Sequence, residues 1–142
     1  MNSRVTLLSL IALFFLSCEV GEINIATCGP RPVISADFYA NTIDQAQTSV
    51  LSADIDGDCL FLSVSVTDVC DVNDVVFELF DSGSVSSGNL PERNLRLVSS
   101  LRRNCGVQET VVLSFDIRNL RVDGNQVQLN IQGSAGAIVY SY

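Results

Sequence analysis

Apolar and polar residues alternate with a period of two through most of the chain from residue 59 onward, as in strands that bury one face. Leu60, Leu62, Val64 and Val66 share one face of the run that begins at Cys59. The same alternation marks later strands near residues 75–79, 95–101, 111–117, 127–131 and 138–142. Two earlier strands are expected near residues 33–38 and 48–55.

Turn residues separate these runs at the spacing expected of a sandwich or barrel. Asp56-Gly57 and Asp123-Gly124-Asn125 are hairpin signals, because Gly, Asn and Asp tolerate the backbone angles of tight turns. Residues 116–120 could form one helical turn, and no longer helix is predicted. We therefore expect an all-β fold, an Ig-like antiparallel β-sandwich of seven or eight strands.

The amino-terminal residues have the three parts of a secretory signal. Arg4 is the one cation, an apolar run of twelve residues spans 5–16, and small residues follow. A transmembrane helix needs about 20 apolar residues, so we expect residues 1–17 to be cleaved. Residues 15–18, Phe-Leu-Ser-Cys, resemble the lipobox of bacterial lipoproteins, which implies that Cys18 carries the lipid. An ordinary signal peptide followed by a chance cysteine is the alternative.

The predicted mature chain starts at residue 18, with a lipidated tether over 18–32 and one β-sandwich domain over 33–142. Without the leader, seven arginines face sixteen acidic residues, a net charge of −9. Nucleic acid is an unsuitable partner for such a chain, since phosphate binding needs a basic face.

Two missing residue types limit the chemistry. The chain has no histidine and no lysine, which excludes an imidazole base, a Ser-His-Asp triad, a histidine-containing zinc site and Schiff-base catalysis. An enzyme would have to rely on carboxylates alone. We therefore expect neither catalytic residues nor a cofactor.

Four cysteines remain if Cys18 is lipidated, an even number in an exported domain. If successive strands alternate in direction, Cys28 and Cys59 lie at one end of the fold, and Cys70 and Cys105 lie at the other. Because bonded Cα atoms must come within about 7 Å, we predict Cys28–Cys59 and Cys70–Cys105 disulfides. Free thiols or a cysteine-only metal site are the alternatives.

Two acidic segments invite a metal interpretation. Residues 54–58, Asp-Ile-Asp-Gly-Asp, begin like a calcium loop but lack the glycine and glutamate positions of an EF-hand, so a hairpin turn is the better explanation. The loop from Asp68 to Asp74 holds several oxygen ligands around Cys70, and weak calcium binding there stays open. No metal site is predicted.

Four arginines lie within eleven residues of this acidic chain. They are Arg93, Arg96, Arg102 and Arg103. Arginine presents a planar fork of donors that suits oxyanions, so these residues are candidates for binding an anion or an acidic glycan. A charged strand edge that discourages aggregation is the alternative.

Residues 57–60 (Gly-Asp-Cys-Leu), the segment 80–95 and the stretch from Asn104-Cys105 to residues 115–117 (Phe-Asp-Ile) resemble a group of small cysteine-containing lipoproteins from Bacteroidota. The resemblance covers about residues 55–142 and concerns mostly turn and strand positions. It implies a fold and an envelope location, and the group has no assigned function.

These features favour a lipid-anchored, non-catalytic binding or structural module of the cell envelope, facing the periplasm or the surface, whose partner is an envelope protein or glycan. The alternative is a tethered inhibitor of a lytic enzyme or protease, with the loop between Asp81 and Glu92 inserted into the enzyme's cleft. A carboxylate-only enzyme is a third hypothesis.

Overall fold

A computed structural model describes residues 28–101 and 105–142 of the chain. Its strands are, in chain order, β1 (Val33–Ile34), β2 (Ser49–Asp56), β3 (Cys59–Val69), β4 (Val75–Ser86), β5 (Glu92–Leu101), β6 (Val107–Asp116), β7 (Gln126–Ile131) and β8 (Ile138–Ser141). One short helix, α1 (Ala36–Asn41), and two 3₁₀ turns, η1 (Val72–Asp74) and η2 (Arg118–Leu120), complete the described elements. The fold is mostly β, as the alternation predicts.

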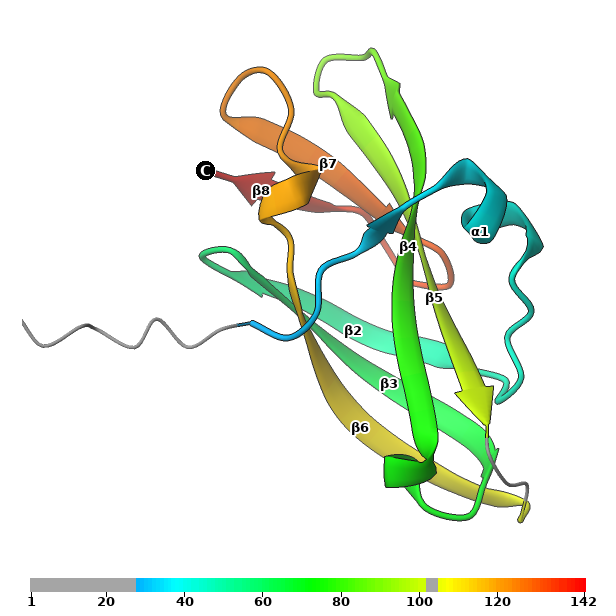
Figure 1. The fold of residues 1–142 in the computed structure, drawn as a ribbon. Coiled ribbons are helices and arrows are strands. Elements are labelled where there is room, and N and C mark those ends of the chain that lie inside the picture. The colour runs from blue at the N-terminus through cyan, green and yellow to red at the C-terminus, as the bar shows by residue number, and fades with distance from the viewer. Residues whose placement is uncertain (1–27, 102–104) are drawn as a thin grey trace, which may run out of the picture.

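The strands form two sheets, shown in Figure 1. The larger sheet has the order β1-β4-β5-β7-β8, and the smaller one has the order β2-β3-β6. Most neighbours are antiparallel, but β1 runs parallel to β4 and β5 runs parallel to β7. The expectation of a purely antiparallel fold is therefore wrong at these two pairs. β6 pairs in the other sheet, so β7 can return beside β5 in the same direction.

The core lies between the two sheets. Leu60, Leu62 and Val64 of β3 are fully buried, and they pack in one cluster with the inward residues of the larger sheet. Those partners include Leu79, Leu95, Leu97, Val127, Leu129 and Tyr140. Burying one aliphatic side chain contributes about 1.5–3 kcal/mol, so this alternating pattern is the main source of stability.

The strand expected over residues 33–38 is wrong beyond Ile34. Ser35 ends the extended segment and caps helix α1, because its Oγ accepts a hydrogen bond from the Phe38 backbone N–H at 3.3 Å. Phe38 stacks on Phe80 of β4 with ring centroids 5.8 Å apart. The helix therefore covers the outer face of the larger sheet.

The segment assigned to the end of the tether, residues 28–32, belongs to the folded domain. The Pro30 carbonyl accepts a hydrogen bond from the Asp116 backbone N–H at 3.1 Å. A Cβ at Gly29 would overlap the Ser114 carbonyl oxygen, so only glycine permits this close approach. The domain thus includes Cys28, and the boundary predicted at residue 33 lies too far along the chain.

Candidate functional site

A hollow of about 440 Å³ opens at one end of the two-sheet fold. It lies between the β4–β5 hairpin and the segment that follows η2, two loops that stand side by side in Figure 1. Its lining consists of Val85, Pro91, Arg93, Arg121, Val122 and Asp123. Three of these residues are apolar and three are charged, so the hollow offers a partner both apolar contact and charged groups.

The β4–β5 hairpin forms one wall of this hollow and projects beyond it. The pairing of β4 with β5 is interrupted between Asp81 and Val85, where Gly83 adopts a φ of +75° that favours glycine. The Gly83 N–H donates to Asp81 Oδ1 at 2.8 Å. Residues 83–89 are exposed. The segment predicted as a loop is thus largely a strand extension with a short turn, which presents its tip to solvent.

A buried ion pair forms the floor of the hollow. Arg93 Nη1 donates to Asp81 Oδ1 at 2.9 Å, and the two side chains are only 11% and 0% exposed. Arg93 Nε and Asp81 Oδ2 are buried and have no hydrogen-bond partner among the described residues. This pair fixes the hairpin to the sheet at a considerable desolvation cost.

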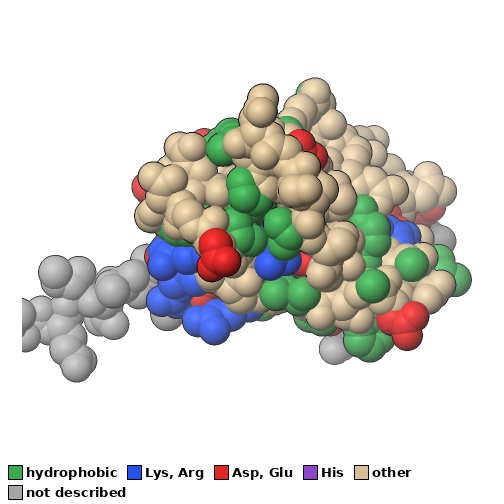
Figure 2. All heavy atoms as spheres, turned by 90° about the horizontal axis from the view of Figure 1, so that it is seen from above, with side chains coloured by type: hydrophobic (Ala, Val, Ile, Leu, Met, Phe, Trp, Pro, Cys, Tyr) green, Lys and Arg blue, Asp and Glu red, His purple; other side chains and the backbone are tan. Residues whose placement is uncertain are grey.

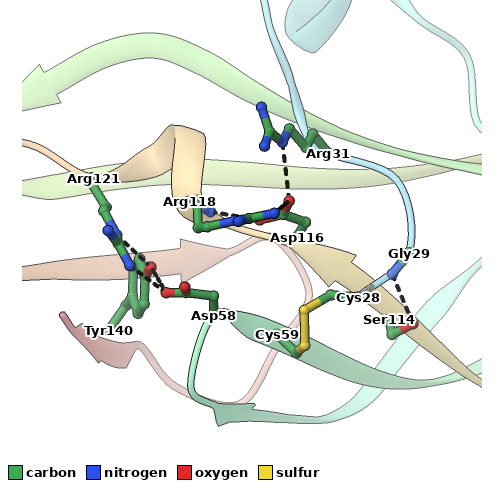
Figure 3. Close-up of a disulfide and its surroundings, with 10 residues drawn as sticks. All are labelled: Cys28, Gly29, Arg31, Asp58, Cys59, Ser114, Asp116, Arg118, Arg121 and Tyr140. Atoms are coloured by element: carbon green, nitrogen blue, oxygen red, sulfur yellow. Dashed lines mark hydrogen bonds and ion pairs between the residues drawn. A yellow bond between two sulfur atoms is a disulfide. The ribbon is translucent and has the colours of Figure 1, made fainter. Parts of the chain in front are cut away.

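A second set of charges surrounds the Cys28–Cys59 disulfide, as Figure 3 shows. Arg118 Nε and Nη2 donate to the two carboxylate oxygens of Asp116 at 2.9 and 2.6 Å, and Arg31 Nε donates to Asp116 Oδ2 at 3.0 Å. The hydrogen bonds from Arg118 hold the pKa of Asp116 far below its usual range, against the opposing effect of burial. Asp116 is therefore ionised at any physiological pH.

The neighbouring cluster joins the last strand to the β2–β3 turn. The Tyr140 hydroxyl donates to Asp58 Oδ1 at 2.5 Å, and Arg121 Nη2 donates to the same oxygen at 2.6 Å. The hydrogen bond from Tyr140, with help from Arg121, lowers the pKa of Asp58, although burial opposes the shift. Burial, followed by the bond to Asp58, raises the pKa of Tyr140. We call Arg31, Arg118 and Arg121 the arginine cluster.

The structure separates the arginines that the sequence places together. Arg93 faces the hollow, whereas Arg96 lies on the opposite face of β5 and donates to the Tyr39 carbonyl at 2.7 Å. Arg102 and Arg103 lie outside the described residues. The structure therefore does not bring Arg93 and Arg96 together, and anion binding by the four predicted arginines stays a prediction. Sequence reasoning missed the arginine cluster, although the close spacing of Asp116, Arg118 and Arg121 was a usable signal.

The structure joins Cys28 to Cys59 and Cys70 to Cys105, with Cα–Cα distances of 5.2 and 4.7 Å. This is the pairing that the strand directions predict. Two disulfides are typical of proteins that fold in an oxidising compartment outside the cytoplasm. Cys18, the predicted lipid site, lies outside the described residues.

The acidic segments serve local structure. Asp58 is bound by Tyr140 and Arg121, and Gly57 turns the hairpin with a φ of +57°. Asp71 caps η1 by accepting from the Asn73 backbone N–H at 2.9 Å. Within residues 28–101 and 105–142, no three His, Cys, Asp or Glu side chains are placed to hold one metal ion. No helix in this same part of the chain is long and apolar enough to cross a membrane.

Comparison with known proteins gives a relationship of fold. The sequence matches no protein-family model and no curated protein. The structure resembles a NigD-like immunity protein from Bacteroides caccae, with a TM-score of 0.56, 15% identity, and coverage of 80% of this chain and 59% of that one. It also resembles a protein of unknown function, DUF1344, from Bacteroides vulgatus, with a TM-score of 0.51, 12% identity, and coverage of 81% and 57%.

A candidate lipoprotein from Bacteroides fragilis aligns with a TM-score of 0.47 and 10% identity over 81% of this chain and 69% of that one. This chain spans less than two thirds of the first two structures. At such identities the likeness concerns the fold alone. The fold is therefore shared with the first two of these Bacteroides structures.

Proposed function

We propose that the protein is a lipid-anchored, non-catalytic binding domain of the cell envelope, held to a membrane through Cys18. The observation that carries this proposal is the projecting β4–β5 hairpin beside an open hollow lined by apolar and charged residues. The Asp81–Arg93 pair and the pairing of β4 with β5 fix the hairpin to the larger sheet. A rigid surface of this kind loses little entropy when it binds a partner.

The environments of Asp116 and Asp58 support a non-catalytic role. A general acid or base works best when its pKa lies near the working pH. Arginine and tyrosine contacts instead hold the pKa values of Asp116 and Asp58 below the ordinary value, so both carboxylates stay ionised. The chain has no histidine or lysine to take over proton transfer.

A second candidate function is a tethered inhibitor of a lytic enzyme or protease. The fold similarity to a structure described as a NigD-like immunity protein favours this candidate. The hairpin tip is the element that would enter an enzyme's cleft, because residues 83–89 project from the sheet and are exposed. An inhibitor of this kind acts on a harmful enzyme by binding alone.

Capture of partners from intact cells tests the proposed function. Crosslinking followed by mass spectrometry should recover a specific envelope protein or glycan with the intact chain, and deletion of residues 84–89 should abolish the capture. A matched pair of substitutions refines the test, because Val85 and Val76 lie on the same strand and are 45% and 47% exposed. Val85→Asp should weaken capture at least tenfold, whereas Val76→Asp should leave it unchanged.

Three results would oppose parts of this proposal. Equal loss of capture with both valine variants would move the binding surface away from the hairpin. Hydrolysis by the purified protein that disappears on changing one aspartate would contradict a non-catalytic role. Failure of a fatty-acid probe to label the chain, or equal labelling of a Cys18→Ser variant, would show that Cys18 does not carry a lipid anchor. If the captured partner is a lytic enzyme or protease whose activity falls on binding, the inhibitor form is supported.

A further inference from the structure

We propose that the arginine cluster is a contact surface for the anionic phosphate headgroups of the membrane that carries the anchor. This inference rests on the proposed anchoring of the chain. It assigns the cluster a role beyond the hollow, which only Arg121 of the three arginines lines, and it predicts which side of the domain faces the membrane. Four observations support it: the exposure of the charges, their unused donors, their position beside the tether, and the charge of the remaining chain.

The guanidinium groups lie outside the carboxylates that they neutralise. The side chains of Arg31, Arg118 and Arg121 are 58%, 49% and 43% exposed, whereas those of Asp116 and Asp58 are 8% and 35% exposed. A surface that approaches this side therefore meets positive charge first. Figure 2 shows several basic side chains gathered on one side of the molecule, with other basic side chains elsewhere on the same face.

Each arginine keeps donors that the structure does not use. Arg31 donates only through Nε, and Arg118 and Arg121 each donate only through Nε and Nη2. The remaining N–H groups make no hydrogen bond with the described residues and belong to half-exposed side chains. Guanidinium groups bind phosphate oxygens through several directed hydrogen bonds. The ion pairs to Asp116 and Asp58 hold the guanidinium planes in place for this contact.

The tether ends beside this surface. Cys28 is bonded to Cys59, and Arg31 lies three residues after Cys28 in the sequence. The ten residues from Cys18 to Cys28 span at most about 35 Å when extended, so an anchored chain keeps the cluster near the headgroups. Charge attraction is screened within about 8 Å at physiological ionic strength. The tether therefore supplies the proximity that these short-range contacts need.

The charge of the remaining chain strengthens the orientation. Residues 18–142 have seven arginines and sixteen acidic residues, a formal net charge of −9, so an anionic membrane repels the acidic remainder of the domain. Three of the five arginines in residues 28–101 and 105–142 belong to the cluster. A basic side chain near an anionic surface contributes about 1 kcal/mol, which corresponds to about a fivefold change in population. The domain should therefore rest on its arginine cluster.

Nuclear magnetic resonance on nanodiscs tests this orientation. Residues 1–18 are replaced by a histidine tag, which is held by a diamagnetic cobalt(III)-chelating lipid, so that the result does not depend on acylation of Cys18. A trace of gadolinium-labelled headgroup lipid then broadens the amide signals of residues near the membrane. The bulk lipid is either phosphatidylglycerol, which is anionic, or phosphatidylcholine, which is neutral overall and shows the effect of the tether alone.

On phosphatidylglycerol, the amide signals of residues 116–121 should broaden several-fold more than those of η1, which lies at the Cys70 end of the fold. The ratio of these two broadenings should be smaller on phosphatidylcholine. Arg31→Gln should lower the ratio about fivefold, because Asp116 keeps its contacts with Arg118 and the fold persists. Arg96→Gln is the matched control, since it removes the same charge from the opposite face of β5 and should leave the ratio unchanged.

The same ratio on both lipids, or equal effects of the two variants, would overturn the proposal. A shift of the Arg118 and Arg121 signals by millimolar inorganic phosphate, as large as that caused by phosphatidylglycerol, would overturn it in favour of a small-anion site. Binding of an acidic protein that displaces the cluster from the bilayer would overturn it in favour of a protein interface. If Cys18 is not acylated, the proposed function is contradicted. The nanodisc result is unaffected, because the histidine tag replaces the lipid anchor in that experiment.

Discussion

Arg31 and Asp116 are 85 residues apart in the sequence, and a 3.0 Å hydrogen bond from Nε to Oδ2 joins them. Asp116 is also bound by Arg118, so one carboxylate connects the amino-terminal segment, the end of β6 and η2. The Cys28–Cys59 disulfide lies beside this junction in Figure 3. The junction fixes the segment around Arg31 to the end of β6.

Asp116→Asn should lower the free energy of unfolding by about 1–2 kcal/mol at pH 7, because it removes charged hydrogen bonds whose arginine partners are half exposed. The lowered pKa of Asp116 also determines the pH dependence. Its stabilisation is complete above the ordinary aspartate pKa of about 4 and is lost as the pH falls below that value. Urea unfolding should therefore show the two proteins converging between about pH 4 and pH 2.

Asp54→Asn is the control for this measurement. Asp54 is exposed, and its side chain accepts only from the backbone N–H of Ile55. Its substitution should change stability by less than about 0.5 kcal/mol. A constant difference between wild type and Asp116→Asn across the acid range would contradict the role given to Asp116.

The Asp81–Arg93 pair should show strong non-additivity. Removing one partner, as in Asp81→Leu, leaves the other charge buried and should cost about 3–5 kcal/mol, whereas the double variant Asp81→Leu/Arg93→Met should recover most of that loss. Chemical denaturation of the four proteins measures the coupling. If the losses simply add, the pair does not form in solution, and the floor of the hollow is different from the one described.

The sequence predicts the β elements well because each strand buries one face. The residues at positions 60, 62, 64 and 66 are all fully buried, as their spacing requires. The same rule explains why two of the arginines clustered in the sequence do not lie together. Arg93 and Arg96 are three residues apart, and an odd spacing places two strand residues on opposite faces.

Other features depend on contacts that no local pattern contains. Helix α1 has only six residues, too short for a clear helical period, and packing on Phe80 rather than propensity stabilises it. The parallel pairing of β5 with β7 exists because β6 joins the other sheet. The arginine cluster combines residues 31, 118 and 121, which only the folded chain brings together.

Each disulfide should make a large contribution to stability. The two bonds join cysteines that are separated by 31 and by 35 positions in the sequence. In the chain-entropy account, a disulfide that closes a loop of this length raises the free energy of unfolding by about 3–4 kcal/mol. Cys70→Ala/Cys105→Ala should therefore lower stability by about that amount. Cys28→Ala/Cys59→Ala should do the same and also free the segment around Arg31. Hydrogen exchange should show faster exchange at Asp116, whose N–H is bonded to Pro30, only in the second variant.

Tyr140→Phe should destabilise the protein by about 1.5–3 kcal/mol, the range for hydrogen bonds to charged groups. Tyr140 is fully buried, and its hydroxyl donates to Asp58 and accepts from Arg121 Nε at 2.9 Å. Loss of the hydroxyl leaves both partners to water, and only the apolar ring continues to pack in the core. Because Asp58 then loses the main contact that lowers its pKa, its titration measured by carboxyl-carbon resonance should move back toward the ordinary value.

The raised pKa of Tyr140 gives an independent test at alkaline pH. A raised pKa means that folding favours the protonated phenol, so this stabilisation is complete below the ordinary tyrosine pKa of about 10 and is lost as the pH rises through the folded-state value. The wild type should lose stability above pH 10 more steeply than Tyr140→Phe. Tyr39→Phe is the matched control, because the Tyr39 hydroxyl makes no hydrogen bond with the described residues and its loss should leave stability and the Asp58 titration unchanged. An equal effect of both substitutions would show that ring packing, and not the bond to Asp58, holds β8 against the β2–β3 turn.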